Sequence, residues 1–353
     1  MKYAELVRRI QDGVLTSEEA KQAFRADAPD ASSFSPRFVL DEAAVDIAGI
    51  ERAARASATE LAYQASLSLR TVRVGALAAA MGAVAAPARP LLAEGDSWFN
   101  LPDLPLVPPT LVDDLAASYS IANIAHWGDT LEEVVASGEA LSRLAKGQFD
   151  YFLISAGGND VLGGGHLQDF IRQRVSGDND VNNAPLYIQE NYYQRAAEIE
   201  RVYGGFVRQA AKVSPKTKIF IHGYDYCLPR QGGHWLGEPL RFRGFDPFGN
   251  RDLARAIVRV LVDDFNTRLK RLVQSIPNVV HVDVRNTVQE GDWWDELHPG
   301  TAAAQRLAAL FKAAIGGGPA QPMAIAAGVQ DLAAQAPAPK SKASRRRSTA
   351  KPS

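Results

Sequence analysis

The sequence predicts an α/β domain in which helices cover both faces of a parallel sheet. From Pro90 onward, short runs rich in Ile, Val, Leu and Phe alternate with longer helical stretches. Short continuous apolar runs are typical of strands buried on both faces, and their alternation with helices is typical of a parallel sheet. A chain of 353 residues is also long enough to bury the core that such a fold needs.

Predicted strands and helices alternate along the whole of this region. Strands are predicted at residues 90–94, 119–124, 151–155, 218–222 and 279–284, and helices at 109–117, 131–144, 189–213, 253–275 and 301–315. Two long irregular segments, 163–183 and 228–250, follow the third and fourth strands. Loops of this length in a compact domain are commonly binding loops or disordered segments, and aromatic residues favour binding for the second.

The chain on either side of this domain has a different composition. Residues 1–87 are Ala-rich and predicted to form a helical extension, with Thr16 and Glu19 at the spacing of a capping box. The run 75–88 imitates a signal peptide but lies far inside the chain, so we expect a buried Ala-rich helix. The main domain is assigned to residues 88–316, and the Ala/Pro-rich segment 317–353 is predicted to be disordered.

Charge and cysteine content limit the classes of function. The net charge of −1 argues against wholesale nucleic-acid binding, although residues 340–353 carry six positive charges and no acid. This tail is either a solvated end or a docking site for an anionic membrane or nucleic acid. The single cysteine, Cys227, forbids an internal disulfide, and no secretion signal begins at Met1. These two observations predict a cytoplasmic protein, whereas the oligomeric state stays open.

Four short motifs carry the chemistry, and each follows a predicted strand or precedes the last helix. Ser97 lies in Gly-Asp-Ser-Trp, Gly128 in Trp-Gly-Asp, Asn159 in Gly-Asn-Asp, and Asp295 and His298 in Asp-Glu-Leu-His. The carboxyl ends of parallel strands meet at one edge of a sheet, which predicts that these residues converge. Together they supply a nucleophile, hydrogen-bond donors for an oxyanion, a general base and the carboxylate that orients it.

Taken singly, the motifs have ordinary structural interpretations. Ser97 could cap a helix, while Gly128 and Asn159 are common turn residues. Asp295 and His298 are the most informative pair, because a spacing of three residues can place a carboxylate beside an imidazole in one turn. The combination and order of the motifs therefore carry the functional interpretation.

In that order, the four motifs resemble those of the SGNH/GDSL hydrolase family over residues 88–315. The resemblance implies a flavodoxin-like three-layer α/β/α fold with a five-stranded parallel sheet. It implies that Ser97 is the nucleophile, His298 the base and Asp295 its orienting group. It also implies an oxyanion hole made by the Ser97 amide, the Gly128 amide and the Asn159 side chain.

The first motif departs from the family pattern by having Trp98 where the family name implies Leu. We therefore predict that aromatic residues beside the motifs bind the substrate, namely Trp98, Phe99, Trp127 and Trp294. No cofactor is expected, and no His, Cys and Asp residues share the spacing of zinc ligands.

The function predicted from these residues is hydrolysis of a small-molecule ester through an acyl-enzyme. A short acyl chain or an O-acetylated substrate is expected, because nothing in the sequence resembles a long apolar lid. Two alternatives remain open. One is a lysophospholipase or thioesterase of the same fold, and the other is a non-catalytic adaptor that uses the N-terminal segment and the basic tail.

Overall fold

The main domain is built on a five-stranded parallel sheet with the strand order β4-β3-β5-β6-β7. The computed structural model describes residues 1–26, 38–47, 58, 61–62, 64–65, 89–101, 107–147, 149–246, 249–318 and 320. The strands are β3 (Pro90–Gly95), β4 (Ser120–Asn123), β5 (Tyr151–Ser155), β6 (Lys218–His222) and β7 (Val279–Val282). All five predicted strands are confirmed, within two residues at each end, together with the α/β class.

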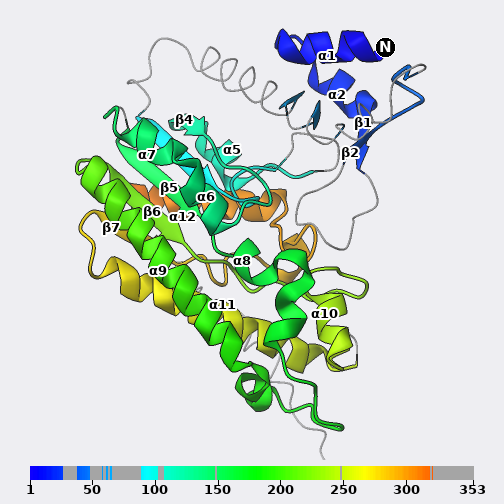
Figure 1. Cartoon of the computed structure of the whole chain (residues 1–353), viewed down its shortest axis with the longest axis vertical. Helices are drawn as coiled ribbons and strands as arrows, with labels where there is room; N and C mark the ends of the chain where they lie inside the picture. Colours follow the sequence, from blue (N-terminus) through cyan, green and yellow to red (C-terminus); the bar gives the residue numbers. More distant parts are fainter. Residues whose placement is uncertain are drawn as a thin grey trace, which may run out of the picture. The chain divides into compact units, whose positions relative to one another are not determined.

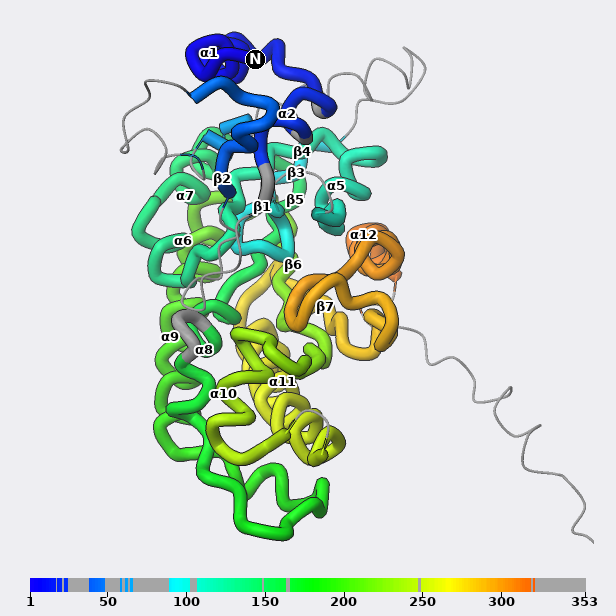
Figure 2. Tube along the Cα trace, turned by 90° about the vertical axis from the view of Figure 1, so that its right-hand side faces the viewer, coloured from blue at the N-terminus to red at the C-terminus, as the bar shows by residue number. Residues whose placement is uncertain are grey.

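Helices cover the sheet on both faces, as Figures 1 and 2 show. Helix α5 (Leu111–Leu115) packs on α12 (Thr301–Ile315), while α9 (Glu190–Val213) packs on α6 (Leu131–Ser137), α7 (Glu139–Leu144) and α11 (Arg251–Val273). In Figure 2 the strands lie between α12 on one side and α6, α7 and α9 on the other. The result is the three-layer α/β/α arrangement that the sequence predicts.

One predicted helix is divided in the structure. The sequence predicts a single helix over residues 131–144, but α6 ends and α7 begins at Gly138, which has φ 64° and lies in the left-handed region. Glycine adopts this conformation readily and commonly terminates a helix. The prediction of one continuous helix is therefore wrong.

The two segments predicted as irregular contain short helices. The first holds two 3-10 helices, Gly163–Phe170 and Val181–Tyr187, which follow the single turn α8 (Asn159–Leu162). The second holds α10 (Gly237–Phe242). Both segments lie after the carboxyl ends of their strands, β5 and β6, where they can contribute to a site.

The N-terminal part is not purely helical, contrary to the prediction. It contains α1 (Tyr3–Gln11) and α2 (Ser17–Ala23), followed by an antiparallel pair of strands, β1 (Phe24–Ala26) and β2 (Phe38–Leu40). The predicted capping box is confirmed: Thr16 accepts a hydrogen bond from the Glu19 amide, and the Glu19 carboxylate accepts one from the Thr16 amide. Leu6, Ile10 and Phe24 belong to an apolar cluster of this part. The predictions for 75–88 and for most of 317–353 lie outside the described residues.

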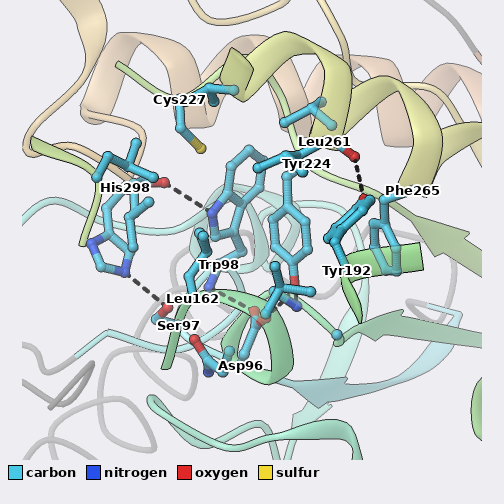
Figure 3. A pocket seen from close by; sticks show the side chains of 18 residues that line it. Asp96, Ser97, Trp98, Leu162, Tyr192, Tyr224, Cys227, Leu261, Phe265 and His298 are labelled. Atoms are coloured by element: carbon cyan, nitrogen blue, oxygen red, sulfur yellow. Dashed lines mark hydrogen bonds between the residues drawn. The ribbon is translucent and has the colours of Figure 1, made fainter. Parts of the chain in front are cut away.

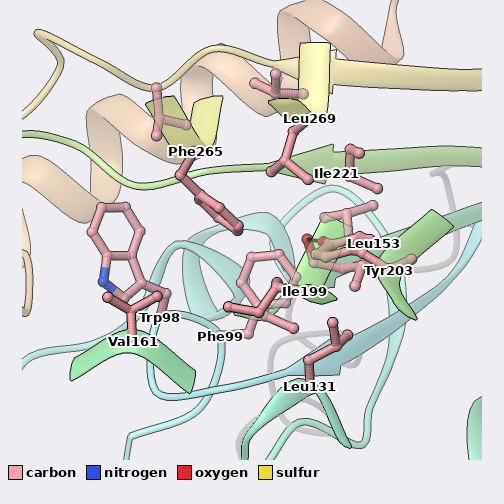
Figure 4. Close-up of a cluster of buried hydrophobic side chains, with 14 of the residues drawn as sticks. Trp98, Phe99, Leu131, Leu153, Val161, Ile199, Tyr203, Ile221, Phe265 and Leu269 are labelled. Carbon is pink, nitrogen blue, oxygen red and sulfur yellow. Dashed lines mark hydrogen bonds between the residues drawn. The ribbon is translucent and has the colours of Figure 1, made fainter. Parts of the chain in front are cut away.

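The core of the main domain forms between the sheet and its helices. Phe99, Leu153, Tyr203 and Ile221 are fully buried, and Figure 4 shows them packed with Phe265 from α11. Burying aromatic and branched aliphatic side chains contributes about 25 cal/mol for each Å² of apolar surface removed from water. The strands thus lie in a closely packed core, and the loops that carry the candidate site begin at their carboxyl ends. In the described part of the chain, no helix is both long and apolar enough to cross a bilayer.

Candidate active site

The candidate nucleophile lies in a tight turn directly after β3. The Asp96 carbonyl accepts hydrogen bonds from the amides of Phe99 (3.1 Å) and Asn100 (3.1 Å), so the chain folds into one helical turn around Ser97. The turn begins at Gly95, which has φ 143° and lies against β5. A Cβ at Gly95 would come within 1.9 Å of the Ser155 carbonyl oxygen. Only glycine therefore fits at the position that sends the chain into the serine turn.

Ser97, His298 and Asp295 form a continuous chain of hydrogen bonds. The Ser97 Oγ lies 2.8 Å from His298 Nε2, and His298 Nδ1 lies 2.7 Å from Asp295 Oδ2. The other carboxylate oxygen, Asp295 Oδ1, accepts the amides of Leu297 and His298, each at 2.7 Å. Residues 201 positions apart in the chain thus meet in the arrangement of a serine hydrolase triad.

The environment shifts the pKa of both members of the Asp295–His298 pair. Burial alone would raise the pKa of Asp295, but the charge of His298 and the hydrogen bonds to the carboxylate lower it overall. Burial alone would lower the pKa of His298, but its charge interaction and hydrogen bond with Asp295 raise it overall. The carboxylate therefore favours the protonated, imidazolium form of His298.

A second hydrogen-bond network, centred on the Asp96 carboxylate, holds the serine turn, residues 96–100. Asp96 Oδ1 accepts from Ser155 Oγ (2.7 Å) and from the Trp98 amide (3.1 Å), and Asp96 Oδ2 accepts from the Tyr224 hydroxyl. The same Tyr224 oxygen accepts the Gly158 amide at 2.9 Å. Burial raises the pKa of Asp96, and the three donors oppose that shift. The network ties the ends of β3, β5 and β6 together beneath Ser97.

The two predicted oxyanion donors outside the serine motif, Asn159 and Gly128, differ in their position relative to the cavity. Asn159 lines the same cavity as Ser97 and His298, and its Nδ2 donates to the Asp129 carbonyl at 2.7 Å. That hydrogen bond uses one of the two amide protons and orients the other. Gly128 has φ 86°, which glycine tolerates, but it is not among the residues that line the cavity. The oxyanion roles of Asn159 and Gly128 stay predictions.

A largely apolar cavity of about 80 Å³ begins at the triad. Figure 3 shows Ser97 and His298 at one end and Tyr192, Leu261 and Phe265 at the other, with Trp98 and Tyr224 between them. Its apolar lining comes from segments far apart in the sequence: Val161 and Leu162 of α8, Tyr192 of α9, Leu236 before α10, and Val258, Leu261, Val262 and Phe265 of α11. Cys227 also faces this cavity.

The four aromatic residues predicted to bind substrate lie in different places. Trp98 lines the cavity, where its Nε1 donates to the Leu297 carbonyl at 3.1 Å. Trp294 is 38% exposed, and its ring centroid lies 6.0 Å from that of His298. Phe99 is fully buried against Phe311, and Trp127 is buried with its ring stacked on His126, so neither lines the cavity.

Several residues that shape the site were not singled out by the sequence. Tyr224 holds the serine turn, and Glu296, between Asp295 and His298 in the chain, accepts four main-chain amides. Tyr224 follows β6 by two residues, so its place at the carboxyl end of a strand was an available signal. The partners of Glu296 are backbone groups, which leave no mark in the sequence. Among the described residues, no cluster of three or more His, Cys, Asp or Glu side chains could hold a metal ion.

Comparison with known families agrees with this fold and geometry. The GDSL-like lipase/acylhydrolase family matches residues 93–311, which is more than half of the chain. The chain therefore belongs to the GDSL-like lipase/acylhydrolase family and is a carboxylic ester hydrolase. No curated protein sequence matches the chain.

Solved structures similar to this chain include lipases and an acetylesterase. A lipase from a goat rumen metagenome is 16% identical, with a TM-score of 0.43, and covers 66% of this chain and 99% of its own. An extracellular lipase from Streptomyces rimosus is 15% identical, with a TM-score of 0.39 and coverage of 62% and 95%. A carbohydrate acetylesterase from Sinorhizobium meliloti is 16% identical, with a TM-score of 0.40 and coverage of 65% and 99%. At such identities a neighbour's substrate does not transfer to this chain.

Proposed function

We propose that the protein hydrolyses carboxylic esters through an acyl-enzyme formed on Ser97. The observation that carries the proposal is the hydrogen-bonded chain from Ser97 Oγ through His298 to Asp295, at 2.8 and 2.7 Å. His298 takes the Ser97 proton as the hydroxyl oxygen attacks the ester carbonyl carbon, and then gives that proton to the departing alcohol. Water then attacks the acyl-enzyme with His298 again as base, which releases the acid and restores Ser97.

The negative charge on the carbonyl oxygen needs donors in the tetrahedral intermediate. The Ser97 amide, the Gly128 amide and the Asn159 side chain are assigned this role, and the fixed orientation of Asn159 by the Asp129 carbonyl supports it. Such donors are effective because they are already oriented before the charge develops. No metal or cofactor is required for these steps.

We further propose that the acyl group is a fatty-type chain longer than acetyl. The sequence alone favours a short acyl chain, because it contains no apolar lid segment. The cavity behind Ser97 is instead lined by Leu, Val, Phe and Tyr side chains of α8, α9 and α11. An apolar chain gains free energy by leaving water for such a cavity, whereas an acetyl group has only one methyl group to bury there.

Two measurements test this function. With p-nitrophenyl esters from acetate to palmitate, we expect kcat/KM to rise above its value for acetate as the chain lengthens, and Ser97→Ala to abolish turnover. Mass spectrometry of protein quenched during turnover of the octanoate ester should show the octanoyl mass on the peptide that contains Ser97. Turnover by Ser97→Ala close to that of the wild type would contradict the assignment of the nucleophile, and a maximum at acetate would contradict the fatty acyl chain.

A further inference from the structure

The Glu296 carboxylate is buried beside the catalytic turn and is fully engaged by main-chain donors. Its side chain is 2% exposed. Glu296 Oε1 accepts the amides of Arg230 and Gly237, both at 2.8 Å, while Oε2 accepts those of Trp235 (3.0 Å) and Leu236 (3.1 Å). Four N–H groups around one carboxylate form a specific site for its two oxygens, since each oxygen has two lone pairs to offer.

All four donors belong to one segment, residues 228–237, which is part of the insertion after β6. Further contacts bind this segment to the chain just before His298. The Leu228 amide donates to the Glu296 carbonyl at 3.2 Å, and the Arg230 guanidinium donates to the carbonyls of Trp293 (2.7 Å) and Trp294 (3.1 Å). At Gly233 the backbone approaches so closely that a Cβ would lie 2.0 Å from the Glu296 carboxyl carbon. The segment is wrapped around Glu296.

The 228–237 segment brings two side chains to the active site. The Trp235 ring lies edge-on to the His298 imidazole, with the centroids 6.0 Å apart and an interplanar angle of 89°. Leu236 is buried and forms part of the wall of the apolar cavity. Glu296, two residues before His298, thus holds Trp235 beside the imidazole and Leu236 in the wall of the cavity.

We propose that Glu296 is a positioning residue that sets acyl-chain selectivity by holding the 228–237 segment against His298 and the cavity. It acts through Trp235 and Leu236 and touches neither the substrate nor the reacting atoms. This inference rests on the proposed function of Ser97 and His298. A carboxylate is required because Gln would present an NH₂ group to two of the four N–H donors and could accept from neither of them there.

Asp225 provides a matched control. Its buried carboxylate also accepts four main-chain amides: those of Tyr226 (2.7 Å) and Asn286 (2.8 Å) on Oδ1, and those of Thr287 (2.8 Å) and Val288 (2.7 Å) on Oδ2. None of these four donor residues lines the cavity. Asp225→Asn should therefore loosen residues 286–288, which lie outside the cavity wall, while the hydrogen bonds of the 228–237 segment to Glu296 stay in place.

The test compares kcat/KM for p-nitrophenyl octanoate and acetate in the wild type, Glu296→Gln and Asp225→Asn. We expect Glu296→Gln to lower the octanoate-to-acetate ratio of kcat/KM by about tenfold, mainly by raising KM for octanoate. A tenfold change is within the range that single contacts in an apolar pocket produce. Asp225→Asn should leave the ratio within about twofold of the wild type. Because the ratio does not depend on the fraction of folded protein, a purely structural role would lower both rates equally and overturn the inference.

Hydrogen exchange followed by mass spectrometry separates this inference from the proposed function. Glu296→Gln should increase exchange in peptides covering residues 228–237, and Asp225→Asn in those covering 286–288. Increased exchange at 228–237 with an unchanged ratio would overturn the selectivity role of Glu296. Absence of Ser97-dependent turnover in the wild type would instead contradict the proposed function. If Glu296→Gln does not fold, Arg230→Met releases the same segment partially, and an unchanged ratio in that variant would also overturn the inference.

Discussion

At the scale of single residues, the site depends on His298 and Asp295, whose polar side-chain atoms are all hydrogen-bonded. His298 is 3% exposed and bonded on both ring nitrogens, to Ser97 and to Asp295. Asp295 is bonded on both oxygens, one to His298 Nδ1 and the other to two amides of its own turn. Such an arrangement favours the tautomer of His298 with its proton on Nδ1, which leaves Nε2 as the acceptor that faces Ser97 Oγ.

The first prediction concerns Asp295→Asn. Asp295 raises the pKa of His298 above its ordinary value of 6.5, so the acid limb of kcat/KM in the wild type should lie above pH 6.5. Without the carboxylate the pKa of His298 falls, and the limb should move to lower pH while the maximal rate falls by about 10³–10⁴-fold. The measurement is a pH–rate profile of both proteins on one ester. Asp292→Asn, which removes a partner of Arg306 outside the triad, is the control. A limb at the same pH in Asp295→Asn would contradict the role assigned to Asp295.

At the scale of elements, the site depends on how closely β3 and β5 approach at their carboxyl ends. Gly95 pairs with Ser155 in the parallel register of these strands, and the Asp96 amide donates to the Ser155 carbonyl at 3.0 Å. The serine turn can begin at this point only because no side chain separates the two strands. Gly95 therefore allows both the close pairing of β3 with β5 and the turn that positions Ser97.

The second prediction compares two glycines that both have positive φ. Gly95→Ala should destabilise the fold by more than about 3 kcal/mol, because the new Cβ would collide with the backbone of β5. Gly147→Ala should cost only about 1–2 kcal/mol, because Gly147 has φ 67° but no atom within 4 Å of the new Cβ. Urea unfolding of the three proteins measures the difference. Equal losses would show that backbone conformation, and not the contact with Ser155, makes Gly95 necessary.

At the scale of the whole molecule, two buried histidines couple stability to pH. Burial lowers the pKa of His222 to about 3 and that of His281 to about 4. The Nδ1 of His222 is hydrogen-bonded to the Gly223 carbonyl, whereas the Nε2 atoms of both rings lack a partner among the described residues. Both side chains are therefore neutral in the folded protein over most of the acidic range.

The third prediction follows from this difference between the folded and unfolded states. Below pH 6.5 the unfolded chain binds protons at these histidines and the folded protein does not, so the contribution of these two histidines to stability should fall from about pH 6.5 towards pH 4. His222→Asn keeps a donor for the Gly223 carbonyl but cannot be protonated, so its stability should depend less steeply on pH although it is lower at pH 7.5. Urea unfolding between pH 4.5 and 7.5 measures both slopes, with the exposed His166→Asn as control. Equal slopes in the wild type and His222→Asn would contradict this account.

The sequence by itself determined the elements and residues that local patterns encode. Apolar runs of four to six residues marked the strands, and the four motifs named Ser97, Asn159, Asp295 and His298 before any geometry was known. The division of 131–144 at Gly138 and the strands of the N-terminal part were missed. Glycine is tolerated within helices, and strand pairing depends on partners distant in the chain.

Only the tertiary structure decided what surrounds the triad. The apolar cavity is assembled from α8, α9 and α11, whose facing residues are indistinguishable in sequence from ordinary core residues. The partners of Glu296 are backbone N–H groups, which every residue except proline possesses, so no sequence pattern could identify them. Local patterns therefore specify Ser97, Asp295 and His298, whereas packing between distant segments specifies the shape and lining of the cavity beside them.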